Sequence, residues 1–281
     1  MKEKILFNSK SGGVTSLDFL SALRSIDADK ADVLYIHTAL NFGVPAGLQK
    51  RELLDSLLET LNELGVATVI FPTYTFSFCN GTGYNVQSSK TPMGLLNDYA
   101  RQQPNAIRSV DPLMSNALIG KHTEFVTDIG KCSVGKNSTF DLLHNTRLKV
   151  KFLFLGPKIG DCFTFMHYIE EREGVPYRYN RVFTGEITNG TNCFEDSYEL
   201  FVRYGNVKPG PGSYIYENIL LEKGIAKRKR VGDGMITIVD EQPAYGCYVD
   251  LLKMSPSFYI SEPFDEKSKT TVFEVTNMVA L

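Results

Sequence analysis

A histidine and a glutamate three residues apart are the side chains of this chain best suited to chemistry. His167 and Glu170 belong to the segment TFMHYIE at 164–170, and on a helix this spacing places both side chains on one face. A carboxylate beside an imidazole can fix its tautomer and raise its basicity, as a general base requires. The same spacing also occurs in exposed ion pairs without a chemical role. The pair alone therefore does not separate a base from a surface contact.

Strands and one helix are expected to position this pair. An apolar strand at 150–155 precedes it, and a second strand at 33–36 leads into the segment HTAL at 37–40. A leucine stripe at 53–64 predicts a helix, and residues 66–71 read as the next strand. Strand, helix and strand with short connections are typical of a largely parallel sheet. Ligands of such sheets bind beyond the carboxyl ends of the strands, which places these segments on one rim.

The pattern changes after residue 171. Antiparallel strands are predicted at 182–187 and 198–204, with an Asn-Gly turn signal at 189–190. A second hairpin is predicted at 226–239, with helices at 215–221 and 245–252.

We therefore predict an α/β fold in which helices flank a central mixed, largely parallel sheet, with a small antiparallel C-terminal subregion. Residues 1–281 are expected to form a single domain, of which 181–281 are an antiparallel and helical extension. The apolar tail at 270–281 is strand-like in composition.

The composition excludes several classes of function. The 281 residues are 43% hydrophobic and 22% charged, with a net charge of -2. This balance gives no electrostatic basis for binding nucleic acid. No apolar run approaches the roughly 20 residues of a membrane-spanning helix, and the apolar part of the N-terminus is too short for a signal peptide.

The cysteines and histidines also limit the interpretation. Five scattered cysteines without a CxxC motif indicate reduced thiols in a cytoplasmic protein. These cysteines and the four histidines show no metal-ligand spacing. His122 and His144 match no motif and are expected at the surface.

Several segments between about residues 33 and 183 together resemble the aminoglycoside 3-N-acetyltransferase family. They are HTAL at 37–40, FPTYT at 71–75, KTPMG at 90–94, RSVDPLMS at 108–115, TFMHYIE at 164–170, and YR at 177–178 with FTG at 183–185. The segment at 164–170 matches the family's Thr-x-x-His-x-x-Glu pattern at every defined position. The chain departs from the family pattern at Asp111, where His is usual, at Ala39, where a second Ser is common, and at Asn85, where Asp is common. The loop at 43–47 also lacks the usual Gly-Gly pair.

The resemblance implies direct transfer of an acetyl group from acetyl-CoA to an amine, without a metal. In that chemistry His167 would be the base, with a pKa near neutral, and Glu170 would orient it. The hydroxyl of Thr38, or backbone N–H groups, would stabilise the oxyanion. The CoA arm would lie along His37, Thr38, Ala39, Val44, Ser109 and Ser115. The acceptor would contact Tyr74, Tyr84, Asn85, Tyr177 and Arg178. A thiolate at Cys162 that first takes the acetyl group is an alternative.

The acceptor is the open part of this interpretation. The near-neutral charge, Asn85 and Asp111 favour an amino sugar, as a nucleotide-linked precursor of surface polysaccharide, over a polycationic antibiotic. An aminoglycoside acceptor, with antibiotic resistance as the outcome, is the alternative, and a non-catalytic binding protein on the same fold is a second one. The expected partners are CoA and a small amine, without nucleic acid or membrane, and assembly into a homo-oligomer is left open.

Overall fold

A seven-stranded mixed sheet forms the centre of the computed structural model, which describes residues 2–270. Its order is β12-β13-β9-β3-β5-β8-β7. The strands are β3 (Val33–Thr38), β5 (Thr68–Pro72), β7 (Ala106–Arg108), β8 (Asn116–Gly120), β9 (Val150–Leu155), β12 (Ala226–Val231) and β13 (Gly234–Asp240). Strand β3 pairs in parallel with β5 and β9, and the other pairs are antiparallel. The predicted mixed sheet is confirmed, and its parallel part is confined to three central strands.

Side-chain alternation in the central strands divides the interior into two cores. In β3, Tyr35 belongs to one hydrophobic cluster and Leu34 and Ile36 to the other. In β9, Phe154 and Leu155 divide in the same way. Because successive side chains of a strand point to opposite faces, every strand of this pattern must be covered on both sides.

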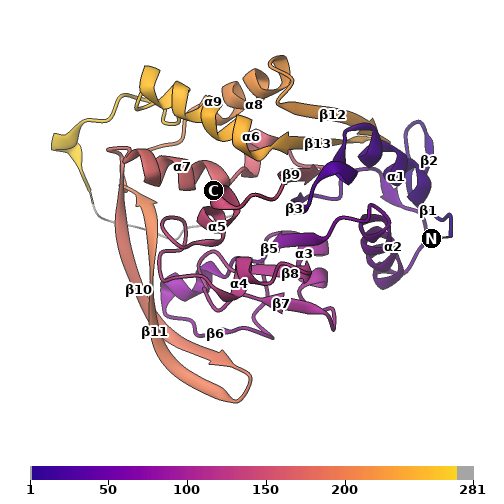
Figure 1. The fold of residues 1–281 in the computed structure, drawn as a ribbon, viewed down its shortest axis with the longest axis horizontal. Helices are drawn as coiled ribbons and strands as arrows, with labels where there is room; N and C mark the ends of the chain where they lie inside the picture. The colour runs from indigo at the N-terminus through magenta and orange to yellow at the C-terminus, as the bar shows by residue number, and fades with distance from the viewer. Residues whose placement is uncertain (1, 271–281) are drawn as a thin grey trace.

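Helices cover both faces of the sheet (Figure 1). One core contains residues from α1 (Ser16–Ser25), α2 (Lys50–Asn62) and α3 (Leu95–Ala100). The other contains residues from α4 (Glu124–Thr127), α5 (Thr139–Asn145), α6 (Ile159–Cys162), α7 (Phe165–Glu173), α8 (Gly212–Glu222) and α9 (Glu241–Met254). Short 3-10 helices lie at η1 (Ala28–Lys30), η2 (Phe76–Asn80) and η3 (Glu266–Ser268). None of the helices within residues 2–270 has both the length and the apolarity to cross a bilayer.

Two smaller sheets accompany the central one. Strands β10 (Arg178–Asn189) and β11 (Asn192–Arg203) form a hairpin longer than predicted, which runs along one side of the molecule in Figure 1. The short β6 (Tyr84–Asn85) joins it in parallel. At the N-terminus, β1 (Ile5–Ser9) pairs with β2 (Gly12–Thr15) and β4 (Val44–Pro45). The boundary expected at residue 181 falls inside β10.

The C-terminal third is part of the central architecture. Strand β13 pairs with β9, directly beside the central parallel strands. Strand β12 then forms the edge of the sheet, and its basic run is used in ion pairs of Lys227 with Asp27 and of Arg228 with Glu217. The predicted hairpin is therefore present and extends the main sheet, while the predicted small antiparallel subregion is the pair of β10 and β11. Apart from its first residue, the tail at 270–281 lies outside the described residues.

Close packing of two strand ends shapes the rim where the site is expected. Gly156 follows β9 with a φ of 102°, and a Cβ placed on it would lie 1.8 Å from the carbonyl oxygen of Ala39, which follows β3. Glycine is required here both by the positive φ and by the contact with backbone. The ends of β3 and β9 are thereby held together.

We expect Gly156→Ala to destabilise the protein by roughly 3 kcal/mol or more, because it adds a backbone clash to the cost of a positive φ. Gly47→Ala is the matched control, since Gly47 also has a positive φ of 75° but no atom within 4 Å of the added Cβ. The control should lose only about 1 kcal/mol. Urea unfolding of both variants measures the difference, and equal losses would contradict the packing argument.

Candidate active site

His167 and Glu170 lie in the interior. Their helix, α7, buries six consecutive residues from Phe165 to Glu170, because it packs between the sheet, α5 and α9. His167 is 4% exposed and Glu170 is completely buried. The Nδ1 atom of His167 lies 3.1 Å from Oε2 of Glu170. The surface-contact interpretation of the pair is therefore excluded.

Glu170 is surrounded by donors from several elements. Its Oε1 accepts hydrogen bonds from Tyr177, at 2.7 Å, and from Tyr248 of α9, at 3.1 Å. Nε of Arg178 forms an ion pair with Oε2 at 2.8 Å. Burial alone would raise the pKa of Glu170, but the charge of Arg178 and the contact with His167 lower it to about 2. Glu170 is therefore a carboxylate at any physiological pH.

His167 is a neutral imidazole in this environment. Burial and, to a smaller extent, the charge of Arg178 lower its pKa, Glu170 raises it, and the net result is a pKa of about 4. The base of near-neutral pKa expected from the sequence is thus a weaker base here, and it is already deprotonated at pH 7. Nη2 of Arg178 also lies 2.8 Å from Nδ1 of His167.

Thr38 faces helix α3, and its hydroxyl hydrogen is already used. Nδ2 of Asn97 donates to the carbonyl of Pro72 at 3.0 Å, which fixes the orientation of this buried amide. Its Oδ1 therefore faces Thr38, whose hydroxyl donates to it at 2.9 Å. Gly94 lies close beside the same hydroxyl, because a Cβ there would be 2.6 Å from Oγ1. In this arrangement the Thr38 hydroxyl is not available as an oxyanion donor.

His37 faces the other side of the sheet, toward α7. Its ring stacks on Phe154 with a centroid distance of 5.0 Å and lies 5.4 Å from the ring of Tyr35. Its Nε2 is buried without a hydrogen-bond partner among residues 2–270. Burial lowers the pKa of His37 to about 3, so the ring is neutral.

A chain of buried hydroxyl groups links the sheet to the start of α7. The Tyr74 hydroxyl lies 2.8 Å from that of Tyr35 and 2.8 Å from Oγ1 of Thr164, and Tyr35 donates to Oδ1 of Asn116 at 2.6 Å. Tyr74 and Thr164, the first residue of the motif, are both buried. Tyr74, expected at the acceptor, is thus part of the core in this structure.

Other predicted ligand contacts are occupied by internal hydrogen bonds. The Tyr84 hydroxyl donates to the carbonyl of Ser109, and Oγ of Ser109 accepts from the backbone of Asn116, each at 2.9 Å. Oγ of Ser115 donates to the carbonyl of Thr73 at 2.5 Å. Both serines and Tyr84 are buried. These side chains hold the loops around the rim together.

The remaining predicted contacts are more open. Ala39 is exposed and Val44 is 70% exposed, in β4 of the N-terminal sheet. Asn85 is half-buried, and its Oδ1 accepts from the backbone N–H groups of Gln87 and Ser88 at 3.0 and 2.8 Å. The Asn85 side chain therefore stabilises a turn.

The two histidines expected at the surface, His122 and His144, and the alternative nucleophile Cys162 are each half-buried. His144 is half-buried: its Nδ1 lies 2.7 Å from Oε1 of Glu241, and its ring stacks on Tyr245 at 4.0 Å. Cys162 is half-buried, and burial raises the pKa of its thiol well above the ordinary range. The thiolate needed for a covalent route through Cys162 is therefore disfavoured.

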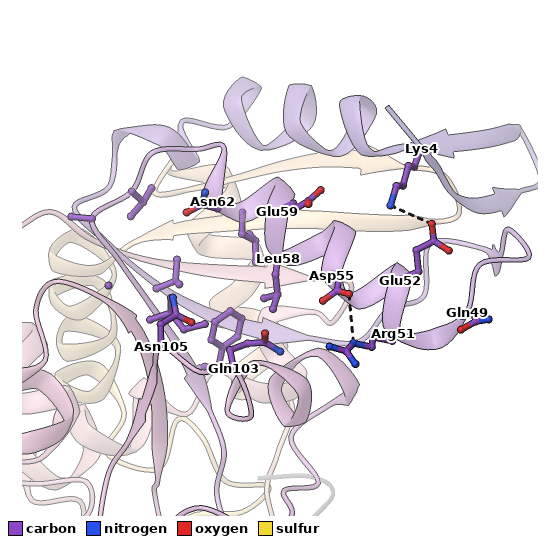
Figure 2. A pocket seen from close by; sticks show the side chains of 17 residues that line it. Lys4, Gln49, Arg51, Glu52, Asp55, Leu58, Glu59, Asn62, Gln103 and Asn105 are labelled. Atoms are coloured by element: carbon purple, nitrogen blue, oxygen red, sulfur yellow. Dashed lines mark ion pairs between the residues drawn. The ribbon is translucent and has the colours of Figure 1, made fainter. Parts of the chain in front are cut away.

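A cavity of about 910 Å³ lies elsewhere, between α2 and the β5–β8 part of the sheet (Figure 2). Acidic side chains of α2, including Asp55 and Glu59, lie around it, with Leu58, Val69 and Ile119 among its apolar lining. None of the predicted site residues lines this cavity. Within residues 2–270, no cluster of three or more His, Cys, Asp or Glu side chains could hold a metal ion.

Comparison with known proteins decides the family. The family model described as aminoglycoside 3-N-acetyltransferase matches residues 36–253. The chain belongs to the aminoglycoside 3-N-acetyltransferase family. The match includes the end of β3, all of α7 and α9 up to residue 253, and thus the His167–Glu170 pair together with Tyr177, Arg178 and Tyr248. No curated protein gives a significant match.

Solved structures of the family have the same fold. Aminoglycoside acetyltransferase AAC(3)-IVa, as the apoenzyme, has a TM-score of 0.70 at 19% identity, covering 90% of this chain and 93% of its own. AAC-IIIb in a binary complex with CoASH has a TM-score of 0.71 at 17% identity, covering 89% and 98%. AAC-VIa bound to sisomicin has a TM-score of 0.70 at 15% identity, covering 85% and 97%. The expected α/β fold is confirmed, and acetyl-CoA as the co-substrate of an N-acetyltransferase agrees with the family.

Sequence reasoning placed Tyr177 and Arg178 at the acceptor, whereas the structure places both against Glu170. It did not identify Tyr248 or Asn97. Tyr177 and Arg178 follow the pair within eight residues, so their proximity to it could have been inferred. Tyr248 lies 78 residues beyond Glu170 and carries no local signal.

His37 gives the stability of the protein a measurable pH dependence. Its folded-state pKa of about 3 lies below the unfolded value of 6.5, so the unfolded chain binds the extra proton as the pH falls below 6.5. Stability from the neutral ring is then lost, by about 2 kcal/mol at pH 5. We expect the stability difference between wild type and His37→Phe to shift by about this amount, against the wild type, between pH 7.5 and pH 5. Urea unfolding at both pH values measures it, and parallel pH profiles would refute a neutral buried His37.

Proposed function

We propose that this chain transfers an acetyl group from acetyl-CoA to an amino group of an aminoglycoside. The observation that carries the proposal is the buried His167–Glu170 pair, in which a neutral imidazole contacts a fully compensated carboxylate. The family supports acetyl-CoA as the donor. Residues 1–281 would act as one unit, because elements from 33–38 to α9 contribute to the site and its supports. A cytoplasmic location is proposed with it, since acetyl-CoA is made there and the five cysteines are free thiols.

The proposed reaction is a direct transfer. The amine nitrogen attacks the thioester carbonyl carbon as His167 takes a proton from the nitrogen. The tetrahedral intermediate collapses, the carbon–sulfur bond breaks, and the CoA sulfur leaves with the electron pair and accepts the proton. Glu170 stabilises the imidazolium while it exists. Thr38 is proposed to position the β3 end through Asn97, and not to donate to the oxyanion.

An aminoglycoside is a better-supported acceptor than the nucleotide-linked amino sugar expected from the sequence. The family is described by aminoglycoside acetylation, and structures with this fold were solved with sisomicin and with apramycin. The expectation of an amino sugar drew on Asp111 and Asn85. Asp111 is buried and accepts hydrogen bonds from Leu113 and Ser133 at 2.8 and 3.0 Å, and Asn85 stabilises a turn. Neither side chain therefore argues against a cationic acceptor.

A non-catalytic binding protein on the same fold is the weaker alternative. Burying an ionised Glu170 beside a histidine requires several compensating donors, and the chain supplies them. A binding protein would gain nothing from this arrangement that an apolar contact could not provide.

His167→Ala should abolish transfer, with a loss in kcat/KM of at least about 10²-fold, because the amine then lacks its base. The matched control is His122→Ala, which removes a half-buried histidine outside the site whose Nδ1 also lies near a glutamate, Glu124, at 3.2 Å. Acetyl-CoA turnover, read as free thiol, is measured with a panel of aminoglycosides and of nucleotide-linked amino sugars. Turnover of the sugars alone would reject the aminoglycoside proposal, and activity retained in His167→Ala would reject the base.

Glu170→Gln should lower the rate and move the acidic limb of the kcat/KM profile to lower pH, because Glu170 raises the pKa of His167. It should also destabilise the protein by about 3–5 kcal/mol, since Arg178 would keep a buried charge without its partner. The two effects are separated by measuring the pH–rate profile well below the unfolding temperature. An acidic limb that does not move would remove Glu170 from the proton transfer.

A further inference from the structure

Arg178 contacts both members of the His167–Glu170 pair. Its side chain is buried, with the residue 6% exposed at the start of β10. Nη2 lies 2.8 Å from Nδ1 of His167, and Nη1 donates to the carbonyl of Phe201 in β11 at 3.2 Å. Nε pairs with Oε2 of Glu170 at 2.8 Å, as an ion pair rather than an aligned hydrogen bond. The guanidinium is thus fixed between the two strands of the hairpin and helix α7.

The contact with Nδ1 restricts where His167 carries its proton. A guanidinium donates only, so a ring nitrogen that bonds to it must offer a lone pair. Oε2 of Glu170 lies 3.1 Å from the same Nδ1 and can only accept while it is ionised. One nitrogen cannot serve both neighbours at once: it accepts from Arg178 or donates to Glu170.

The carboxylate does not need the proton of His167 in this structure. Tyr177 and Tyr248 already donate to Oε1, and the charge of Arg178 compensates Oε2. Without Nδ1, by contrast, Nη2 of Arg178 would lose the hydrogen bond that the structure gives it. The balance of donors and acceptors therefore favours Nδ1 as an acceptor and places the ring proton on Nε2.

We propose that Arg178 is a positioning residue that holds His167 of the substrate-free protein in the Nε2–H tautomer. This inference rests on the proposed function only in assigning His167 as the base. In the resting tautomer the basic lone pair points at Arg178, so Nε2 cannot accept a proton. Base catalysis through Nε2 requires that Nδ1 loses the hydrogen bond it accepts from Arg178 and instead carries a proton that it donates to Glu170. In that exchange Nε2 releases one proton to water and Nδ1 takes one from water, so the ring is neutral before and after.

The acceptor itself would favour this exchange. An ammonium group placed at Nε2 is repelled by an N–H and attracted by a lone pair, so its arrival stabilises the base-competent tautomer. The site would thus be inactive at rest and become competent when a cationic amine occupies it. The other titratable groups around His167, Glu170 and Arg178 are Tyr177, Tyr248, Tyr259 and Arg203.

Histidine ¹⁵N NMR reads the tautomer directly, without substrate. The chain has four histidines, so loss of one signal set in His167→Gln assigns His167. At pH 7.5 we expect the wild-type ring of His167 to carry its proton on Nε2. A proton on Nδ1 would overturn the proposal.

Arg178→Lys keeps a positive charge beside Glu170 but removes the forked guanidinium that reaches Nδ1 and Oε2 together. In this variant the proton should move to Nδ1. In Arg178→Met the pKa of His167 should in addition rise by about one unit, because the neighbouring cation is gone. Arg172→Lys is the control. Arg172 lies on α7, the helix that carries His167, and pairs with Asp141 at 3.3 Å. The Arg172→Lys variant should show the wild-type tautomer.

If Arg178→Lys keeps the wild-type tautomer, the proposal is overturned. That result is the one expected if the role of Arg178 is purely structural. If Arg178→Met does not fold because Glu170 is left uncompensated, Arg178→Lys still decides. The result is also independent of the reaction. A protein that carries the Nε2–H tautomer but acetylates no tested amine would contradict the proposed function and leave the role of Arg178 intact.

Discussion

The buried carboxylate of Glu170 is the constraint on which the rest of the site depends. An ion of this kind is stable in the interior only if every lone pair finds a donor or a charge. Here the partners come from the helix itself, from the segment before β10, from β10 and from α9. These elements cannot move independently without exposing a charge to an apolar interior. Glu170 therefore couples the C-terminal third of the chain to the reacting group.

The central sheet separates residues that are adjacent in the sequence. His37 and Thr38 are neighbours in one strand, so their side chains point to opposite faces. His37 stacks on Phe154 on the side of α7, whereas Thr38 binds Asn97 on the side of α3. The two residues at the end of β3 therefore lie in different environments, one on each face of the sheet. Of these two residues, only His37 lies on the same face of the sheet as the His167–Glu170 pair.

Patterns local to the sequence were sufficient for the parallel centre of the sheet and for the motif at 164–170. The leucine stripe of α2 and the apolar runs of β3 and β9 follow from periodicity alone. The position of β13 beside β9 could not be predicted, because nothing in either strand specifies a neighbour so distant in the sequence. For Tyr74 and Tyr84, the local pattern did not show that the side chains are buried. Aromatic residues among polar ones resemble a binding loop, but here each hydroxyl finds an internal partner and the ring is buried.

The base strength of His167 is a property of its partners more than of the histidine. With its pKa at about 4, accepting a proton from an ammonium with a pKa of about 8 would be uphill by roughly 5 kcal/mol. Burial is the largest cause of the low value and cannot change during the reaction without opening the core. The hydrogen bond at Nδ1 can change, because the proposed exchange replaces the Arg178 donor by the Glu170 acceptor. A site built in this way can keep its base weak in the absence of substrate and strengthen it when an amine is bound, at the cost of one hydrogen bond to Arg178.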